Sequence, residues 1–191
     1  MGCAHIPVGL SSENAAHRIA VEWTNDDGTN QEGVFVPRRD TNSKLNTLSG
    51  GRFFPGDYRH ASFEVTDEQG RIDFHMASDD HEAEIRLTAA EAQSLPKDSI
   101  FGSIETASEF FQKGNVGYSK SCKGDCFDGM TLDTEVWSLS PLEVQDVYSS
   151  YFTSAAFPPG SVEFDCALLM RNIPHTWKAA PEMKLRCLST S

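Results

Sequence analysis

Two neighbouring arginines at the end of a predicted strand are the chemical feature that stands out in this chain. Arg38 and Arg39 precede Asp40, and Arg52 follows the glycine pair at 50–51. A guanidinium group binds a carboxylate or a phosphate through two parallel hydrogen bonds. The three arginines therefore predict a site for a small anion, unless nearby acids neutralise them. Consecutive strand residues point to opposite sides, so only one of Arg38 and Arg39 is expected to face a cavity.

Tyr118 is a further candidate for ligand binding. It lies between two small residues, Gly117 and Ser119, in a predicted strand. Its hydroxyl either lines a cavity or belongs to a core tyrosine with a satisfied hydrogen bond.

Metal and redox motifs are weak in this sequence. Cys122 and Cys126 are separated by three residues, whereas redox and zinc pairs are usually separated by two. We interpret them as incidental thiols of a loop. His75, Asp79 and His81 are explained by turn and surface positions. The sequence therefore predicts no metal site and no cofactor.

Composition limits the class of partner. The 191 residues carry 28 acidic and 16 basic side chains, a net charge of −12, which repels nucleic acid and anionic lipid. No apolar run approaches the roughly 20 residues of a membrane span. Five cysteines, an odd number, and the lack of a glycosylation triplet predict free thiols and a cytoplasmic location. The expected partners are a small-molecule ligand and a second copy of the chain.

Alternating apolar residues indicate a β-rich α+β domain. The clearest strands are three short runs joined by turn residues, which predict an antiparallel meander with one buried face. Further runs predict other strands, and a capped amphipathic helix is expected at 103–113. Shorter helices are expected at 43–48 and 89–95. The predicted strands are 17–23, 33–37, 61–65, 72–76, 83–87, 116–121, 131–139, 142–149 and 162–170.

Five segments together carry a resemblance to a known family. In segment 50–65, a glycine pair, two aromatic residues and a proline lead into an alternating strand. The other segments are 11–18, 33–40, 117–119 and 157–165. The chain resembles an uncharacterised bacterial family of unknown function in the acetoacetate decarboxylase-like superfamily. The resemblance implies one domain over 1–191, folded as an antiparallel β-barrel or curved sheet with a few peripheral helices. Either this chain lacks the family's N-terminal strands or its sequence begins at a late start codon.

The resemblance also bears on catalysis. The decarboxylases use a lysine that forms an imine with a keto acid, beside a second cation that lowers its pKa. Gly56 and Asp57 occupy the matching positions here, so Schiff-base chemistry is not expected. Glu13 matches a glutamate of the enzymes and is the candidate general base. The alternative, which we favour, is that Glu13 caps the turn that begins at Ser11.

Three functions follow from these features. The first is a cavity that binds a small, anionic organic molecule without Schiff-base chemistry. The second is a lyase or hydrolase that acts on a small keto acid through Glu13 and an arginine. The third is a structural or interaction module that keeps only the shell of the fold.

Overall fold

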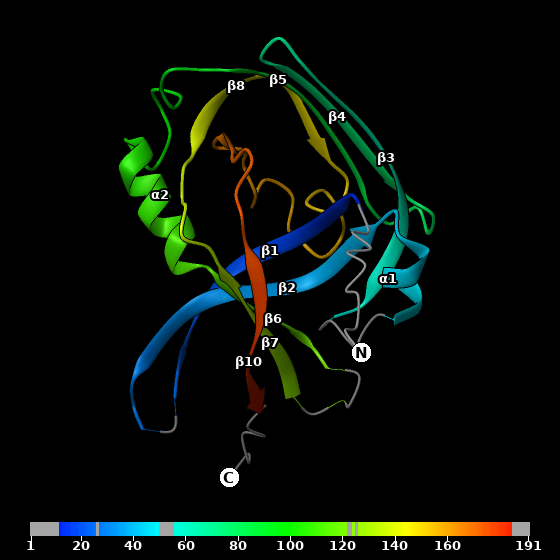
Figure 1. Cartoon of the computed structure of the whole chain (residues 1–191), viewed down its shortest axis with the longest axis vertical. Helices are drawn as coiled ribbons and strands as arrows, with labels where there is room; N and C mark the ends of the chain where they lie inside the picture. Colours follow the sequence, from blue (N-terminus) through cyan, green and yellow to red (C-terminus); the bar gives the residue numbers. More distant parts are fainter. Residues whose placement is uncertain (1–11, 26, 50–55, 122–123, 125, 185–191) are drawn as a thin grey trace, which may run out of the picture.

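A computed structural model describes residues 12–25, 27–49, 56–121, 124 and 126–184. These residues form one large mixed sheet with two helices (Figure 1). The elements in chain order are β1 (Asn14–Thr24), β2 (Asn30–Thr41), α1 (Lys44–Ser49), β3 (Tyr58–Glu68), β4 (Arg71–Ser78), β5 (Glu84–Glu91), α2 (Ile104–Lys113), β6 (Val116–Lys120), β7 (Cys126–Asp133), β8 (Ser140–Ser149), β9 (Ala167–Leu169) and β10 (Thr176–Lys184).

Strand β2 joins the two halves of the sheet. One edge of β2 pairs with β1 in an antiparallel hairpin, from Asn14 opposite Thr41 to Thr24 opposite Asn30. The other edge pairs in parallel with β6 at residues 34–35 and with β3 at residues 39–41. The described strands follow the order β10-β7-β6-β2-β3-β4-β5-β8-β9, with β1 beside β2. A single long strand therefore holds both halves in fixed register.

The half from β3 to β9 is an antiparallel arch that curves over the β1–β2 hairpin (Figure 1). Its concave side buries two small apolar clusters. One contains Ala61, Met76 and Ala83, and the other contains Ile72, Ala89 and Leu142. The predicted meander over 61–87 is confirmed, because β3, β4 and β5 pair in sequence and bury alternate residues.

The sheet differs in two respects from a closed antiparallel barrel. The described strands leave it open between β10 and β9, and two of its pairings are parallel. A β-rich, curved sheet with peripheral helices is thus confirmed. The parallel pairings arise because β3 and β6 both return to the same edge of β2.

The predicted helix at 89–95 is wrong. Strand β5 continues to Glu91, and fully buried Ala89 lies opposite Ile72 on β4 and Val144 on β8. Alanine favours helices in isolation, but pairing on both edges of a central strand outweighs that preference.

The last part of the chain also departs from the predicted strands. The run 162–170 forms a strand only at β9, because Asp165 instead accepts hydrogen bonds from the Ile100 backbone and the Ser99 hydroxyl. The strand predicted at 131–139 lies earlier, at β7. Strand β10 was not predicted, since Pro181 interrupts its pattern.

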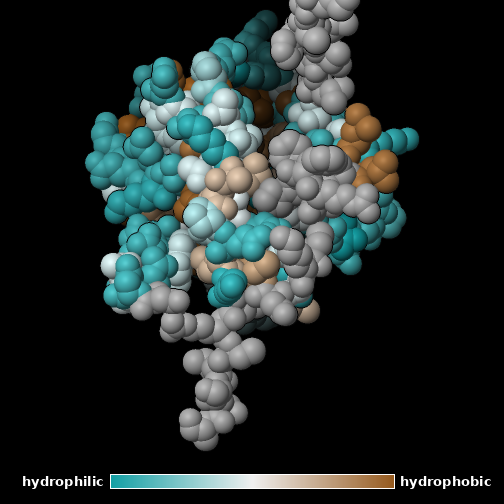
Figure 2. Space-filling view, turned by 60° about the horizontal axis from the view of Figure 1, so that its bottom comes forward, coloured by the Kyte–Doolittle hydropathy of each residue, from teal (hydrophilic) through white to brown (hydrophobic). Residues whose placement is uncertain are grey.

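Helix α2 is confirmed at the expected residues. The Ser103 side chain accepts a hydrogen bond from the Thr106 backbone, Glu105 occupies the first turn and Lys113 the last. The helix at 43–48 is confirmed as α1. In the part of the chain that the structure describes, neither helix has the length and apolarity needed to cross a membrane. On the face shown in Figure 2, hydrophilic residues cover most of the described surface, and apolar residues form small separate spots.

Candidate functional site

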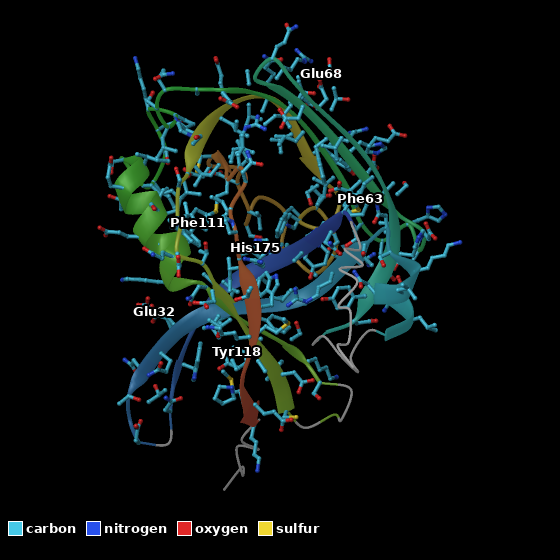
Figure 3. All side chains as sticks on the ribbon, viewed as in Figure 1. Glu32, Phe63, Glu68, Phe111, Tyr118 and His175 are labelled. Carbon is cyan, nitrogen blue, oxygen red and sulfur yellow. The ribbon has the colours of Figure 1, made fainter. Side chains whose placement is uncertain are left out.

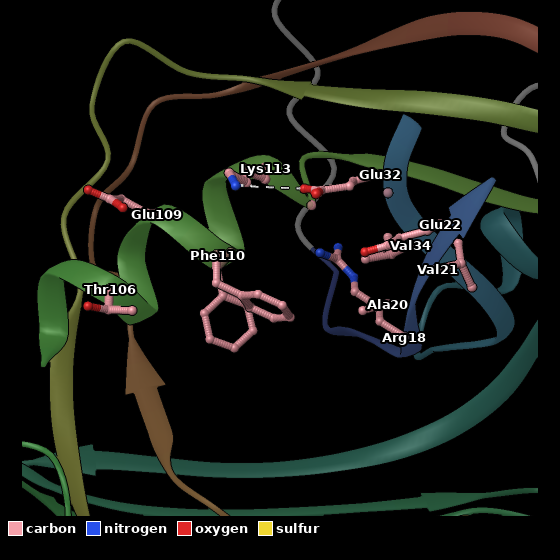
Figure 4. Close-up of a pocket in the computed structure, with 13 residues that line it drawn as sticks. Arg18, Ala20, Val21, Glu22, Glu32, Val34, Thr106, Glu109, Phe110 and Lys113 are labelled. Atoms are coloured by element: carbon pink, nitrogen blue, oxygen red, sulfur yellow. Dashed lines mark ion pairs between the residues drawn. The ribbon is translucent and has the colours of Figure 1, made fainter. Parts of the chain in front are cut away.

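A cleft of about 800 Å³ lies between helix α2 and the β1–β2 hairpin (Figure 4). Its β wall includes Ala20 opposite Val34, and its helix wall includes Phe110 and Phe111. The cleft ends where α2 approaches β2, since a Cβ atom on Gly114 would lie 3.3 Å from Val34. This volume is in the range of cavities that hold small organic molecules.

Arg18 supplies a positive charge to this cleft. It lies at a register irregularity of β1, between His17 and Ile19, and its side chain joins the cleft wall. Among the described residues, no carboxylate forms an ion pair with Arg18. The Arg18 side chain is exposed, but desolvation by its surroundings, followed by the positive charge of Arg39, lowers its pKa. An anion that entered the cleft would relieve both effects.

The other charges of the cleft lie on its wall near the helix and the hairpin. Lys113 pairs with Glu32 across the cleft at 3.9 Å (Figure 4). Glu22 and Glu109 are further lining residues. Because Lys113 is already paired, Arg18 is the cation of the cleft that remains for a ligand among the described residues.

Aromatic rings form the apolar wall of the cleft. Phe101, Phe110 and Phe111 contact one another with ring centroids 5.3–5.7 Å apart. Phe110 and Phe111 remain 46% and 42% exposed, so their faces are accessible to a ligand. The cleft thus combines the guanidinium of Arg18 with the apolar surface of Phe110 and Phe111.

Arg38 does not serve as a free anion site. It is buried, and its guanidinium donates to Asp40 at 2.7–3.1 Å, to Asp80 at 2.8 Å and to Glu82 at 3.1 Å. Burial opposes its charge, but the hydrogen bonds to Asp40 and Asp80 outweigh that effect and raise the Arg38 pKa. Local acids therefore neutralise this arginine, one of the two outcomes that the sequence left open.

His17 lies beside the same cluster, opposite Arg38 in the register. Its ring centroid is 4.1 Å from that of Tyr151. The imidazole is buried, and neither ring nitrogen has a hydrogen-bond partner among the described residues. Nδ1 is 4.0 Å from the Asp40 carboxylate. Burial is the main effect that lowers the His17 pKa, so the ring is neutral at pH 7.

Arg39 reaches different neighbours from Arg38, as strand alternation predicts. It is half-buried, its Nη2 is 3.5 Å from the Ser119 hydroxyl, and its Cζ is 5.8 Å from the Tyr58 ring centroid. Burial lowers its pKa. Gly56 lies against it with φ of +103°, and a Cβ atom there would approach Arg39 Nε to 3.1 Å. Only glycine fits this contact without strain.

Two further predicted residues, Tyr118 and Glu13, do not line the cleft. Tyr118 packs edge-on against Trp23, 5.5 Å between ring centroids, and lies away from Phe111 (Figure 3). Glu13 is exposed, and its backbone exchanges hydrogen bonds with Asn42. Arg52 lies outside the described residues.

Sequence reasoning missed Arg18, because an isolated arginine in an amphipathic strand resembles a surface residue. In the structure its neighbour His17 is buried, whereas Arg18 lines the cleft, and no motif in the sequence marks this difference. No family model, curated protein or solved structure matches the chain.

Proposed function

We propose that the chain binds a small organic molecule with one anionic group and an apolar body in the cleft between α2 and the β1–β2 hairpin. The observation that carries this proposal is the pairing of Arg18, which has no carboxylate partner among the described residues, with the accessible rings of Phe110 and Phe111. A carboxylate would accept hydrogen bonds from the guanidinium while its apolar part covers the rings.

The proposal keeps the ligand class that the sequence suggested but changes the residue that binds it. Arg38 is neutralised by three acids, and Arg39 is packed behind Gly56 and against Tyr58. Arg39 adds to the positive electrostatic potential at Arg18, since its charge helps to lower the Arg18 pKa. Carboxylates are favoured over larger polyanions, since Glu22, Glu32 and Glu109 repel additional negative charge.

The relation to the acetoacetate decarboxylase-like superfamily is part of this proposal and rests on the order of the sequence motifs. The surroundings of Gly56 support the view that this chain is a superfamily member without the Schiff-base chemistry of a catalytic lysine. A Cβ atom at this position would lie 3.0 Å from the Ser119 hydroxyl, so a larger side chain there would be strained and would displace its neighbours.

Paired small molecules test the binding proposal. Aryl and alkyl carboxylates are titrated beside their carboxamide twins, which have the same shape but no charge, and affinity is measured by ligand-observed NMR. A charge-assisted hydrogen bond contributes about 1.5–3 kcal/mol. In an open cleft we expect about 1–2 kcal/mol, so Arg18→Met weakens carboxylate binding roughly 5- to 30-fold.

The controls separate charge from shape. Arg18→Lys is expected to restore part of the affinity, because it returns the charge without the planar fork. Arg71→Met removes an exposed arginine paired with Asp73, away from the cleft wall, and should leave binding unchanged. Equal affinity for carboxylates and carboxamides, or unchanged binding by Arg18→Met, would refute the proposal.

A further inference from the structure

A second group of ligand atoms lies on the other half of the sheet, at the pairing of β7 with β10. Cys126 Sγ and the carboxylate oxygens of Asp128 and Glu182 all lie within 4.8 Å of one another. Cys126 and Asp128 are two residues apart on β7, so their side chains share one face of the strand. None of these residues lines the cleft.

A register irregularity brings the third residue to the same place. Ala180 lies opposite Gly129 and Met183 opposite Phe127, so Pro181 and Glu182 together face Asp128. Such a bulge redirects a side chain that regular pairing would send elsewhere. Glu182 thus meets the two β7 side chains instead of alternating away from them.

The thiol is the buried member of the group. Cys126 is 8% exposed, its thiol is free of disulfide bonds, and no hydrogen bond to a described residue engages its Sγ. Asp128 is half-buried and Glu182 is exposed, which leaves an approach from solvent. A buried sulfur beneath two carboxylates is a donor set with one soft and two hard atoms.

We propose that Cys126, Asp128 and Glu182 bind a divalent cation of the zinc type. Zinc accepts thiolate and carboxylate ligands together, at about 2.3 Å and 2.0–2.2 Å. Ligand atoms around a tetrahedral ion lie about 3.5 Å apart, so modest side-chain rotations close the site. The Cys126 thiol loses its proton to solvent as the sulfur–metal bond forms, and water fills the fourth position.

Cobalt titration of the metal-free protein tests the site. Co²⁺ reports thiolate ligation through a sulfur-to-metal absorption band, and we expect one ion per chain with release of about one proton. The proton count is measured by calorimetry in buffers of different ionisation enthalpy. Zn²⁺ is then expected to displace Co²⁺ and remove the band.

Variants assign the ligands. Cys126→Ser should abolish the band, whereas Asp128→Asn and Glu182→Gln should weaken Co²⁺ binding at least tenfold. Two controls should bind as the unmodified protein: Asp133→Asn, an exposed acid of the same strand, and Cys166→Ser. Burial, with help from Asp165, raises the Cys166 pKa to about 11 and keeps that thiol protonated.

Two results would overturn the proposal. One is the absence of a band, or its survival in Cys126→Ser, which would place sulfur ligation elsewhere. The other is wild-type affinity in Glu182→Gln, a substitution at an exposed position that should leave the fold intact even where Cys126→Ser does not.

Discussion

Substitution of Arg38 by methionine should destabilise the protein severely, because it strips the partner from a fully buried carboxylate. Asp40 is 0% exposed, and the Arg38 guanidinium donates three hydrogen bonds to it, the shortest at 2.7 Å. The imidazole of His17, whose Nδ1 lies 4.0 Å from this carboxylate, is neutral and does not replace the charge of the guanidinium. Removing one member of a buried pair costs about 3–5 kcal/mol.

Urea denaturation measures this change, and a second strand of the same protein provides the control. Arg71 and Asp73 repeat the Arg-x-Asp spacing on β4, with Nε 2.9 Å from the carboxylate, but both side chains are exposed. Arg71→Met should therefore lower the urea midpoint far less than Arg38→Met. The double substitution Arg38→Met with Asp40→Leu removes both charges and should recover much of the loss. Equal effects of Arg38→Met and Arg71→Met would refute the reasoning.

The loss of stability caused by Arg38→Met should also depend on pH, in a direction that the Asp80 pKa determines. Burial opposes the charge on Asp80, but hydrogen bonds from Arg38 and Ser78 outweigh it and lower the Asp80 pKa. A carboxylate whose pKa is lowered by folding stabilises the folded state at pH values above its pKa in the unfolded chain, which is near 3.9. This stabilisation is lost as the pH falls from there toward the lowered pKa. Without Arg38 most of that contribution is absent. The stability gap between the two proteins should be widest at neutral pH and narrow below about pH 4.

Two further predictions concern His17 and Gly56. The His17 pKa lies below its ordinary value near 6.5, so the folded state should lose stability as the pH drops through and below that value. The substitution His17→Phe should remove this pH dependence, which a series of thermal melts at different pH values would measure. Persistence of the dependence in His17→Phe would assign it to another group. Gly56→Ala should cost about 2–4 kcal/mol in urea denaturation, because positive φ and the close Arg39 and Ser119 atoms both oppose a Cβ. Gly70 also has a positive φ, +80°, but no atom lies near the position of its Cβ, so Gly70→Ala should cost only about 1–2 kcal/mol. Equal losses of stability in Gly56→Ala and Gly70→Ala would show that the contacts at Gly56 are unimportant.

Local patterns in the sequence were enough to predict much of the secondary structure. Period-two alternation located β3, β4 and β5, and the Ser103 cap with Lys113 located α2, because these signals act between residues close in the chain. The same alternation predicted that Arg38 and Arg39 have different neighbours. It could not decide which one is neutralised, since Asp80 and Glu82 are 42 and 44 residues from Arg38.

Only the tertiary structure decided where the candidate ligand sites lie. Alanine favours helices, but Ala89 lies in a strand because β4 and β8 pair on either side of it. Arg18 becomes a candidate for anion binding only when α2 folds across the hairpin and completes the cleft. Glu182 meets Cys126 only through the irregular pairing of β10 with β7. The sequence determines what each residue can do chemically, but long-range pairing determines which residues can do it together, because the energy of a strand depends on the neighbours it acquires.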